Sequence, residues 1–113
     1  MKVIKKPSDS VKVQDAHGGS GSRKLFLGGG EVRNFQGVTY GWLPSGHMYA
    51  WHNHDDLNEI MIVLKGCGSV RDDDGEYSFD EGDFFVFPKA VFHEIKNTGE
   101  IENEFVFVRV YDK

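Results

Sequence analysis

One stretch of the chain, residues 46–66, restricts the possible folds more than any other segment. It reads GHMYAWHNHDDLNEIMIVLKG and carries His52, His54 and Glu59 between two glycines. Alternate residues of a β-strand point to the same face, about 6.6 Å apart, so the imidazoles of His52 and His54 can approach one point. A polar turn at residues 55–58 can return the chain and bring Glu59 to that point. Three nitrogen and oxygen donors arranged in this way indicate a site for a divalent metal ion.

A second stretch, residues 82–97, supplies a fourth donor. It reads GDFFVFPKAVFHEIKN, and His93 lies in a strand-like part of it with apolar residues nearby. With His93 the candidate site contains three imidazoles and one carboxylate. Four such donors leave open positions on a five- or six-coordinate ion, and open positions are what a catalytic metal site needs.

The remaining sequence predicts short strands separated by turns. Asp74-Gly75 is a strong hairpin signal, and no segment has a sustained 3.6-residue period, so we expect helices to be short at most. A calcium loop at residues 72–74 is disfavoured because the later glutamate that such a loop requires is missing. Many short strands with frequent turns are typical of an all-β barrel or sandwich. We expect strands near residues 11–13, 24–27, 38–43, 50–54, 59–64, 69–71, 76–79, 83–87, 90–95 and 104–111.

The two stretches resemble the two sequence motifs of the cupin superfamily. The first motif is a glycine, two histidines, a glutamate and a second glycine at fixed spacing, and it is matched in full by Gly46, His52, His54, Glu59 and Gly66. In the second motif Ala90 stands where a glycine is usual, a departure that affects a turn and no ligand. The other positions of the second motif are matched by Gly82, Pro88, His93 and Asn97.

The resemblance implies a fold, a ligand set and an assembly. The fold is a double-stranded β-helix, or jelly-roll barrel, with little or no helix. One divalent transition metal ion (Mn, Fe, Ni, Zn or Cu) would lie inside the barrel, bound by His52, His54, Glu59 and His93. Small single-domain cupins often form homodimers through their edge strands. The resemblance does not imply one reaction, because the fold hosts isomerases, dioxygenases, decarboxylases, lyases, cyclases and sugar-binding sensors.

Length and composition set the domain organisation and exclude several partners. A chain of 113 residues fits one domain, and we expect a partly flexible N-terminal arm at residues 1–23 followed by a single barrel at residues 24–113. The net charge of −5 argues against nucleic acid, and no apolar run reaches the length of a membrane span. The single cysteine, Cys67, allows no intramolecular disulfide, and the N-terminus lacks the apolar core of a secretory signal. We therefore expect a cytoplasmic protein.

Strand alternation predicts which side chains share the cavity with the metal ligands. If His52 and Glu59 face inward, alternation also turns Met48 and Ala50 inward on one strand, and Met61 and Val63 inward on the next. From His93 the same alternation turns Ile95 inward. On the last strand, bulky aromatic residues that fill a small barrel favour the inward set Phe105, Phe107 and Arg109 over Val106, Val108 and Val110.

Four further positions have two readings each. Arg109 is either an anchor for a substrate carboxylate or phosphate, or a surface arginine that pairs with an acid such as Glu104. Tyr40 and Trp42 share a strand face and form either a pocket wall or ordinary core packing. His17 lies either near the pocket mouth or in a solvated loop.

The leading functional hypothesis is a metal-dependent enzyme that acts on a small organic acid or sugar acid. The metal would act as a Lewis acid for isomerase, lyase or decarboxylase chemistry, or would activate oxygen in a dioxygenase. The candidate catalytic residues are Glu59, which is a metal ligand before it is a base, Tyr49 as a proton donor or acceptor, and Arg109 as an anchor. The alternative is a non-catalytic cupin that binds or senses a small molecule.

Overall fold

The regular secondary structure of the described residues is almost entirely strand, in agreement with the all-β prediction. The computed structural model describes residues 4–113, so residues 1–3 of the predicted arm lie outside it. The larger sheet contains, in spatial order, β1 (Val13–Ala16), β2 (Gly21–Leu27), β3 (Phe35–Leu43), β10 (Asn103–Tyr111), β5 (Leu57–Lys65) and β8 (Phe84–Phe87). The smaller sheet contains β4 (Met48–His52), β9 (His93–Lys96), β6 (Gly68–Arg71) and β7 (Glu76–Phe79). Two single turns of 3-10 helix, η1 (Ser8–Ser10) and η2 (His17–Gly19), complete the structure.

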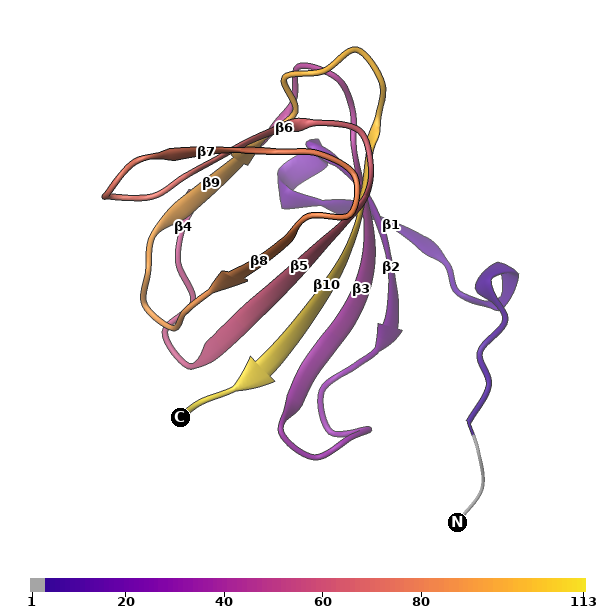
Figure 1. The fold of residues 1–113 in the computed structure, drawn as a ribbon. Helices are drawn as coiled ribbons and strands as arrows, with labels where there is room; N and C mark the ends of the chain where they lie inside the picture. Colours follow the sequence, from indigo (N-terminus) through magenta and orange to yellow (C-terminus); the bar gives the residue numbers. More distant parts are fainter. Residues whose placement is uncertain (1–3) are drawn as a thin grey trace.

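From β3 onward the strands pair in a nested order. β6 pairs with β7, β5 with β8, β4 with β9 and β3 with β10, every pair antiparallel. The chain is thus a long hairpin wound into two sheets that face each other, which is the predicted jelly roll (Figure 1). Within residues 4–113, hydrogen bonding does not continue from one sheet into the other, so the barrel consists of two facing sheets. None of the described helical turns has the length or hydrophobicity that a membrane crossing requires.

The core lies between the two sheets and follows the predicted alternation on three strands. On β5, Met61 and Val63 are fully buried. On β10, Phe105 and Phe107 face inward, as bulky residues in a small barrel should. Ile95 on β9 is also buried. The cluster is completed by Leu43, Tyr49, Val70, Phe79 and Phe87.

Strand β4 does not follow the predicted alternation. Met48 and Ala50 are exposed, whereas Tyr49 between them is only 2% exposed and belongs to the core. The register between β4 and β9 shifts between Tyr49 and His52, which marks a β-bulge or similar irregularity. An extra residue on one strand reverses which side chains face inward. The prediction that Met48 and Ala50 face the cavity is therefore wrong, and Tyr49 takes their place.

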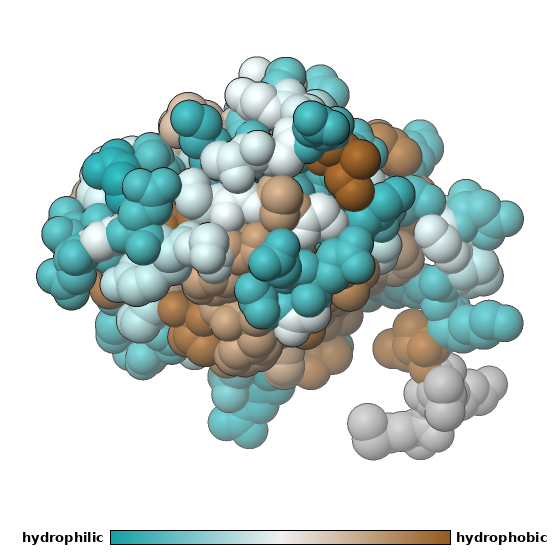
Figure 2. Space-filling model, turned by 45° about the horizontal axis from the view of Figure 1, so that its top comes forward, coloured by the Kyte–Doolittle hydropathy of each residue, from teal (hydrophilic) through white to brown (hydrophobic). Residues whose placement is uncertain are grey.

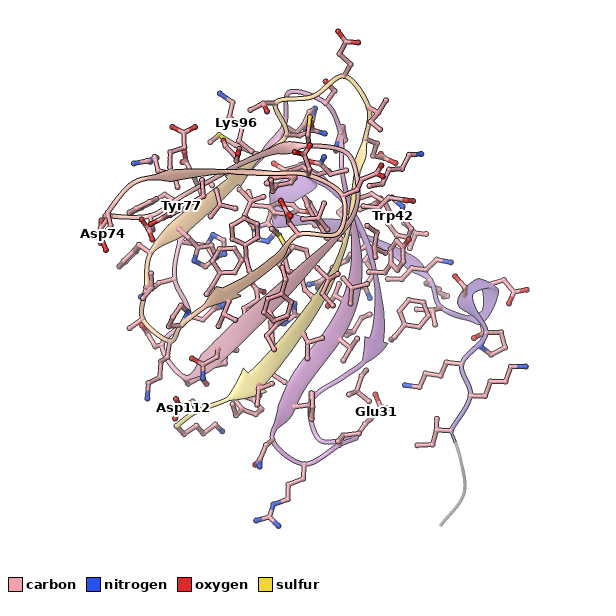
Figure 3. All side chains as sticks on the ribbon, in the orientation of Figure 1. Glu31, Trp42, Asp74, Tyr77, Lys96 and Asp112 are labelled. Atoms are coloured by element: carbon pink, nitrogen blue, oxygen red, sulfur yellow. The ribbon has the colours of Figure 1, made fainter. Side chains whose placement is uncertain are left out.

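Strand β3 presents its small residues to the barrel interior. Gly37, Thr39 and Gly41 are buried, while Tyr40 and Trp42 alternate with them on the outer face. The rings of Tyr40 and Trp42 lie 4.8 Å apart, and Trp42 Nε1 donates a hydrogen bond of 3.0 Å to Glu104 (Trp42 is labelled in Figure 3). The prediction that these two rings form a wall of the barrel pocket is wrong, and so is the alternative that they belong to the core.

Strands β1 and β2 form a hairpin that extends the larger sheet beyond β3. β2 pairs with β3, and its Arg23 is the direct cross-strand partner of Gly41. The turn between β1 and β2 is η2, which contains His17 in a left-handed conformation with φ of 45°. Residues 4–12 precede β1 at the edge of the larger sheet (Figure 1), where Lys6 Nζ donates a hydrogen bond of 2.6 Å to the carbonyl of Phe26 and Lys24 Nζ donates one of 2.7 Å to the carbonyl of Ser8. The hairpin therefore brings residues 16–23 to the open end of the two sheets.

Two residues of the second motif stabilise the loops around the site. Asn97 is 1% exposed, and its Nδ2 donates hydrogen bonds of 2.9 Å to the carbonyls of Leu43 and Ile101. Ala90 has a φ of 69°, in the left-handed region that favours glycine, and its N–H donates a hydrogen bond of 2.7 Å to the carbonyl of His54. The turn at Ala90 thus ties the second motif to the first.

Replacing Ala90 with glycine should stabilise the protein. The left-handed conformation costs an alanine about 1–2 kcal/mol, and the added flexibility of glycine in the unfolded chain offsets about half of this. We expect Ala90→Gly to raise the free energy of unfolding by about 0.5–1 kcal/mol in urea denaturation. The matched control Ala50→Gly, in strand β4, should lower it by a similar amount. Equal losses in both variants would contradict the strain at Ala90.

Candidate metal centre

The nested strand pairing brings the four predicted ligands to one place. His52 on β4 is the direct cross-strand partner of His93 on β9. Glu59 lies on β5 in the facing sheet, and His54 follows β4 by two residues. One potential ligand atom from each of the four residues lies within 4.8 Å of all the others. Donors bound to one ion at ~2.1 Å lie at most about 4.2 Å apart, so a small contraction would complete a shared site.

Two of the imidazoles are oriented by backbone carbonyls. His52 Nδ1 lies 2.6 Å from the carbonyl oxygen of Ala50, and His93 Nδ1 lies 3.1 Å from that of Val91. A carbonyl oxygen only accepts hydrogen bonds, so each Nδ1 carries a proton, and in the neutral ring each Nε2 then carries the lone pair. Backbone contacts of this kind fix the ring and tautomer of metal-binding histidines in general.

The inner nitrogen atoms of the cluster lack hydrogen-bond partners. Nε2 of His54 and Nε2 of His93 are both inaccessible to solvent and unbonded among the described residues. Each lies 3.8 Å from Oε1 of Glu59. A buried polar atom without a partner costs free energy, and a cation between these three residues would remove that cost. The donor set and its orphaned nitrogens therefore fit a divalent metal ion.

The protonation states of the cluster also suit a metal. Burial alone would raise the pKa of Glu59, but His93, His54 and Arg109 outweigh it, and the pKa of Glu59 lies below its ordinary value. Burial, more than any neighbouring charge, lowers the pKa of His54 and keeps its ring neutral near pH 7. An ionised carboxylate and neutral imidazoles are the forms that bind metal ions.

Arg109 lies beside the cluster and is held from three directions. Its Nη1 is 3.5 Å from Oε2 of Glu59, its cross-strand partner on β5. Its Nε donates a hydrogen bond of 2.6 Å to Gln36, and its Nη2 donates to Thr39. Gly37 also packs against this side chain. A Cβ atom at position 37 would lie only 2.9 Å from Nη2 of Arg109, so a glycine at this position leaves the space that the guanidinium occupies. Pairing between Arg109 and Glu104 at the surface is therefore ruled out.

Tyr49 and His17 form one side of the cavity beside His52. Tyr49 is buried, and burial raises the pKa of its hydroxyl. The His17 ring stacks on it with centroids 4.4 Å apart and lies 5.2 Å from the ring of His52. Burial of that stacked face, followed by the charge of His52, lowers the pKa of His17 to about 4. His17 thus lies at the pocket mouth, in a turn that remains exposed to solvent.

Two adjoining cavities open next to the cluster. Both are lined by His17, Arg23, Glu59 and Arg109, and the more open one has a volume of about 350 Å³. Such a volume suits a small molecule. Sequence reasoning did not identify Arg23. The signal that could have found it is its register, because pairing opposite Gly41 turns it to the inner face, but that pairing cannot be read from the sequence of β2.

Comparison with known proteins gives one family and several structural neighbours. A family model described as "Cupin domain" matches residues 41–109. An uncharacterised protein of Methanocaldococcus jannaschii is 28% identical over 101 residues, which cover 89% of this chain and 81% of that protein. Protein SchB of Streptomyces halstedii is 31% identical over 78 residues, which cover 69% of this chain and 55% of that relative, so the chain spans just over half of its length.

Two solved structures have the same fold at low sequence identity. A predicted oxalate decarboxylase of Thermotoga maritima superposes with a TM-score of 0.84 at 21% identity, covering 96% of this chain and 99% of that one. A sugar phosphate isomerase from a cupin superfamily, from Silicibacter pomeroyi, superposes with a TM-score of 0.79 at 22% identity, covering 95% of this chain and 75% of that one. At these identities the likeness concerns the fold.

Adding a divalent metal ion to chelator-treated protein should stabilise it. The orphaned nitrogens of His54 and His93 gain a partner only in the folded state, so binding adds about 2.7 kcal/mol at a hundred times the dissociation constant. We expect the melting temperature to rise with Mn²⁺, Fe²⁺, Ni²⁺, Zn²⁺ or Cu²⁺ in a thermal shift series.

The variant His52→Ala should lose most of this rise. His47→Ala is the matched control, because His47 is exposed and lies outside the cluster, and it should keep the rise in full. A rise of the same size in His52→Ala would remove His52 from the ligand set.

Proposed function

The chain belongs to the cupin domain family, and we propose that it is a metal-dependent enzyme acting on a small organic acid or sugar acid in the barrel pocket. One observation carries the proposal. The buried, unbonded Nε2 atoms of His54 and His93 face the ionised Glu59 at 3.8 Å, next to an open cavity that also contains an arginine. These nitrogen atoms make no hydrogen bond that would stabilise the core. Donor atoms that converge without such bonds and lie next to an open cavity are the arrangement that a catalytic metal ion needs.

One divalent transition metal ion, Mn, Fe, Ni, Zn or Cu, would be held by His52, His54, Glu59 and His93. When bound, it would supply Lewis-acid chemistry by polarising a substrate oxygen, or redox chemistry if it is iron or manganese. Within this chain Glu59 serves the ion as a carboxylate. Its contact with Arg109 limits its freedom to act as a base at the same time.

Arg109 and Tyr49 are the proposed substrate-handling groups of the cavity lining. Arg109 is a fixed cation at the cavity wall and would orient an acidic group of the substrate. Tyr49 lines the narrower cavity with its hydroxyl proton retained by burial, so it would act as a proton donor to a substrate oxygen. The aromatic wall beneath, which includes Phe107, would limit the access of water.

The names of the structural neighbours support an acidic substrate class without fixing it. One neighbour is named a predicted oxalate decarboxylase and the other a sugar phosphate isomerase. Both names refer to small anionic molecules. The cation at Arg109 fits a substrate of the same charge.

The proposed function predicts a linked loss of metal and activity. Protein purified without added metal should contain close to one transition metal ion per chain by mass spectrometry. In an assay of small organic and sugar acids, the wild type should turn over at least one of them. His93→Ala should lose most of the metal and the turnover, whereas His47→Ala should keep both. Arg109→Lys should keep the metal but lose about tenfold or more in kcat/KM, because a single ammonium group cannot contact Glu59, Gln36 and Thr39 together and so cannot keep the cation fixed at the cavity wall.

The metal and oxygen measurements also separate the reaction classes. Iron with oxygen uptake during turnover indicates a dioxygenase, and zinc, nickel or manganese without oxygen uptake indicates isomerase, lyase or decarboxylase chemistry. A wild type that holds the metal and binds acids but turns none of them over would contradict the enzyme and support the alternative, a cupin that binds or senses a small molecule.

We also propose that two copies pair through the outer face of the larger sheet. Figure 2 shows one face of the molecule, where brown apolar residues come to the surface among hydrophilic ones. On the outer face of the larger sheet, two apolar rows cross four strands, and on β8 they end in Phe84 and Val86, which are 60% and 52% exposed. A second copy offers an equally apolar and self-complementary surface. By register, the rows are Val38, Val108, Ile60 and Val86, and Tyr40, Val106, Ile62 and Phe84.

Sedimentation velocity tests this pairing. The sedimentation data of the wild type should give a molecular mass of about twice the 12.8 kDa of one chain. Val108→Lys places a charge in the middle of one row and should give a monomer with unchanged circular dichroism. Ser78→Lys, on an exposed position of the smaller sheet, should remain dimeric. A monomeric wild type would refute the pairing.

A further inference from the structure

Arg23 is a second arginine of the pocket, and it comes from a part of the chain outside both motifs. It lies on β2 as the cross-strand partner of Gly41. Residues directly opposite each other on paired strands share a face, and Gly41 is on the inner face of β3. Arg23 accordingly lines both cavities beside the metal cluster, together with Glu59 and Arg109.

Unlike Arg109, Arg23 is not neutralised by the protein. Its Nε is inaccessible to solvent and has no hydrogen-bond partner among residues 4–113. None of the ion pairs that the structure describes involves it. Arg109 by contrast contacts Glu59, Gln36 and Thr39. A guanidinium group has five N–H donors. A buried N–H donor without a hydrogen-bond partner costs free energy, and a ligand that accepts a hydrogen bond from it would remove that cost.

The charges around the cavity favour an anion. Arg23 and Arg109 line both cavities, so two guanidinium groups border the same space. The positive charges of the lining would be those of the two arginines and a divalent ion. The negative charges would be those of Glu59 and Asp15. The cavity would then carry a net positive charge, which attracts and orients anionic ligands. A guanidinium with free donors matches a carboxylate in a bidentate geometry.

We propose that Arg23 binds a carboxylate of the substrate while other substrate oxygens reach the metal centre, so that the pocket is selective for small carboxylic acids. Arg23 and not Arg109 then provides the main recognition, because Arg109 is already engaged by the protein. This proposal rests on the proposed function, since it places the substrate between Arg23 and the metal cluster.

Calorimetric titration of metal-loaded protein tests the proposal. The protein is loaded with the divalent ion that stabilises it most and titrated with oxalate, malonate, succinate and acetate, and with imidazole as a neutral probe of the open metal position. At least one carboxylate should bind the wild type. Arg23→Gln should weaken that binding by about tenfold or more, the size of a charged hydrogen bond, with metal content and imidazole binding unchanged. Arg23→Lys should recover part of the loss because it keeps the charge.

The matched control is Arg33→Gln, which removes the same charge from an exposed turn before β3 and should leave carboxylate binding unchanged. Equal affinities in Arg23→Gln and Arg33→Gln would overturn the proposal, and so would a metal-loaded wild type that binds none of the carboxylates. A wild type that takes up no metal would refute the proposed function instead. The same titrations on metal-free protein then decide the role of Arg23, because its charge does not depend on the metal.

Discussion

The antiparallel pairing of β4 with β9 and of β5 with β10 is the constraint on which the candidate site depends. The first pair sets His52 opposite His93, and the second sets Glu59 opposite Arg109. A slip of one residue in either ladder would turn these side chains to the outer face. The fully buried Met61, Val63 and Phe105 oppose such a slip, because their exposure would cost about 1.5–3 kcal/mol each. The hydrophobic core thus fixes the geometry of a polar site that contributes no apolar burial of its own.

Much of the fold followed from the sequence because a two-residue period survives wherever strands are regular. The alternation on β5, β9 and β10 was predicted correctly down to Phe107 and Arg109. It failed on β4, where the register shift after Tyr49 puts an extra residue into the strand. Such irregularities arise from how neighbouring strands fit together, and no residue in MYAWH marks one. The outward position of Trp42 was missed for a related reason, since a large aromatic side chain suits both faces of a sheet.

The grouping of His52, His54 and Glu59 could be predicted because their spacing matches strand geometry on both sides of one turn, and His93 was added from the second motif. Their assignment as ligands is still a prediction. The orienting carbonyls of Ala50 and Val91 could not be predicted, because any backbone carbonyl is a candidate until the side-chain rotamer is known. Arg23 could not be found either, since its role depends on the long-range pairing of β2 with β3. A local pattern of hydrophobicity does not show which distant strands pair with each other.

The two arginines divide two tasks that one residue could not perform. A cation that contacts a metal ligand, as Arg109 contacts Glu59, lowers the pKa of that carboxylate and keeps it ionised. If Arg109 left Glu59 to bind substrate, the carboxylate would lose part of this support at the moment when the ion needs it. A separate cation with free donors avoids that conflict. The β1–β2 hairpin supplies one at the open end of the sheets, so a hairpin outside both motifs completes a cavity that the motifs alone leave without a free cation.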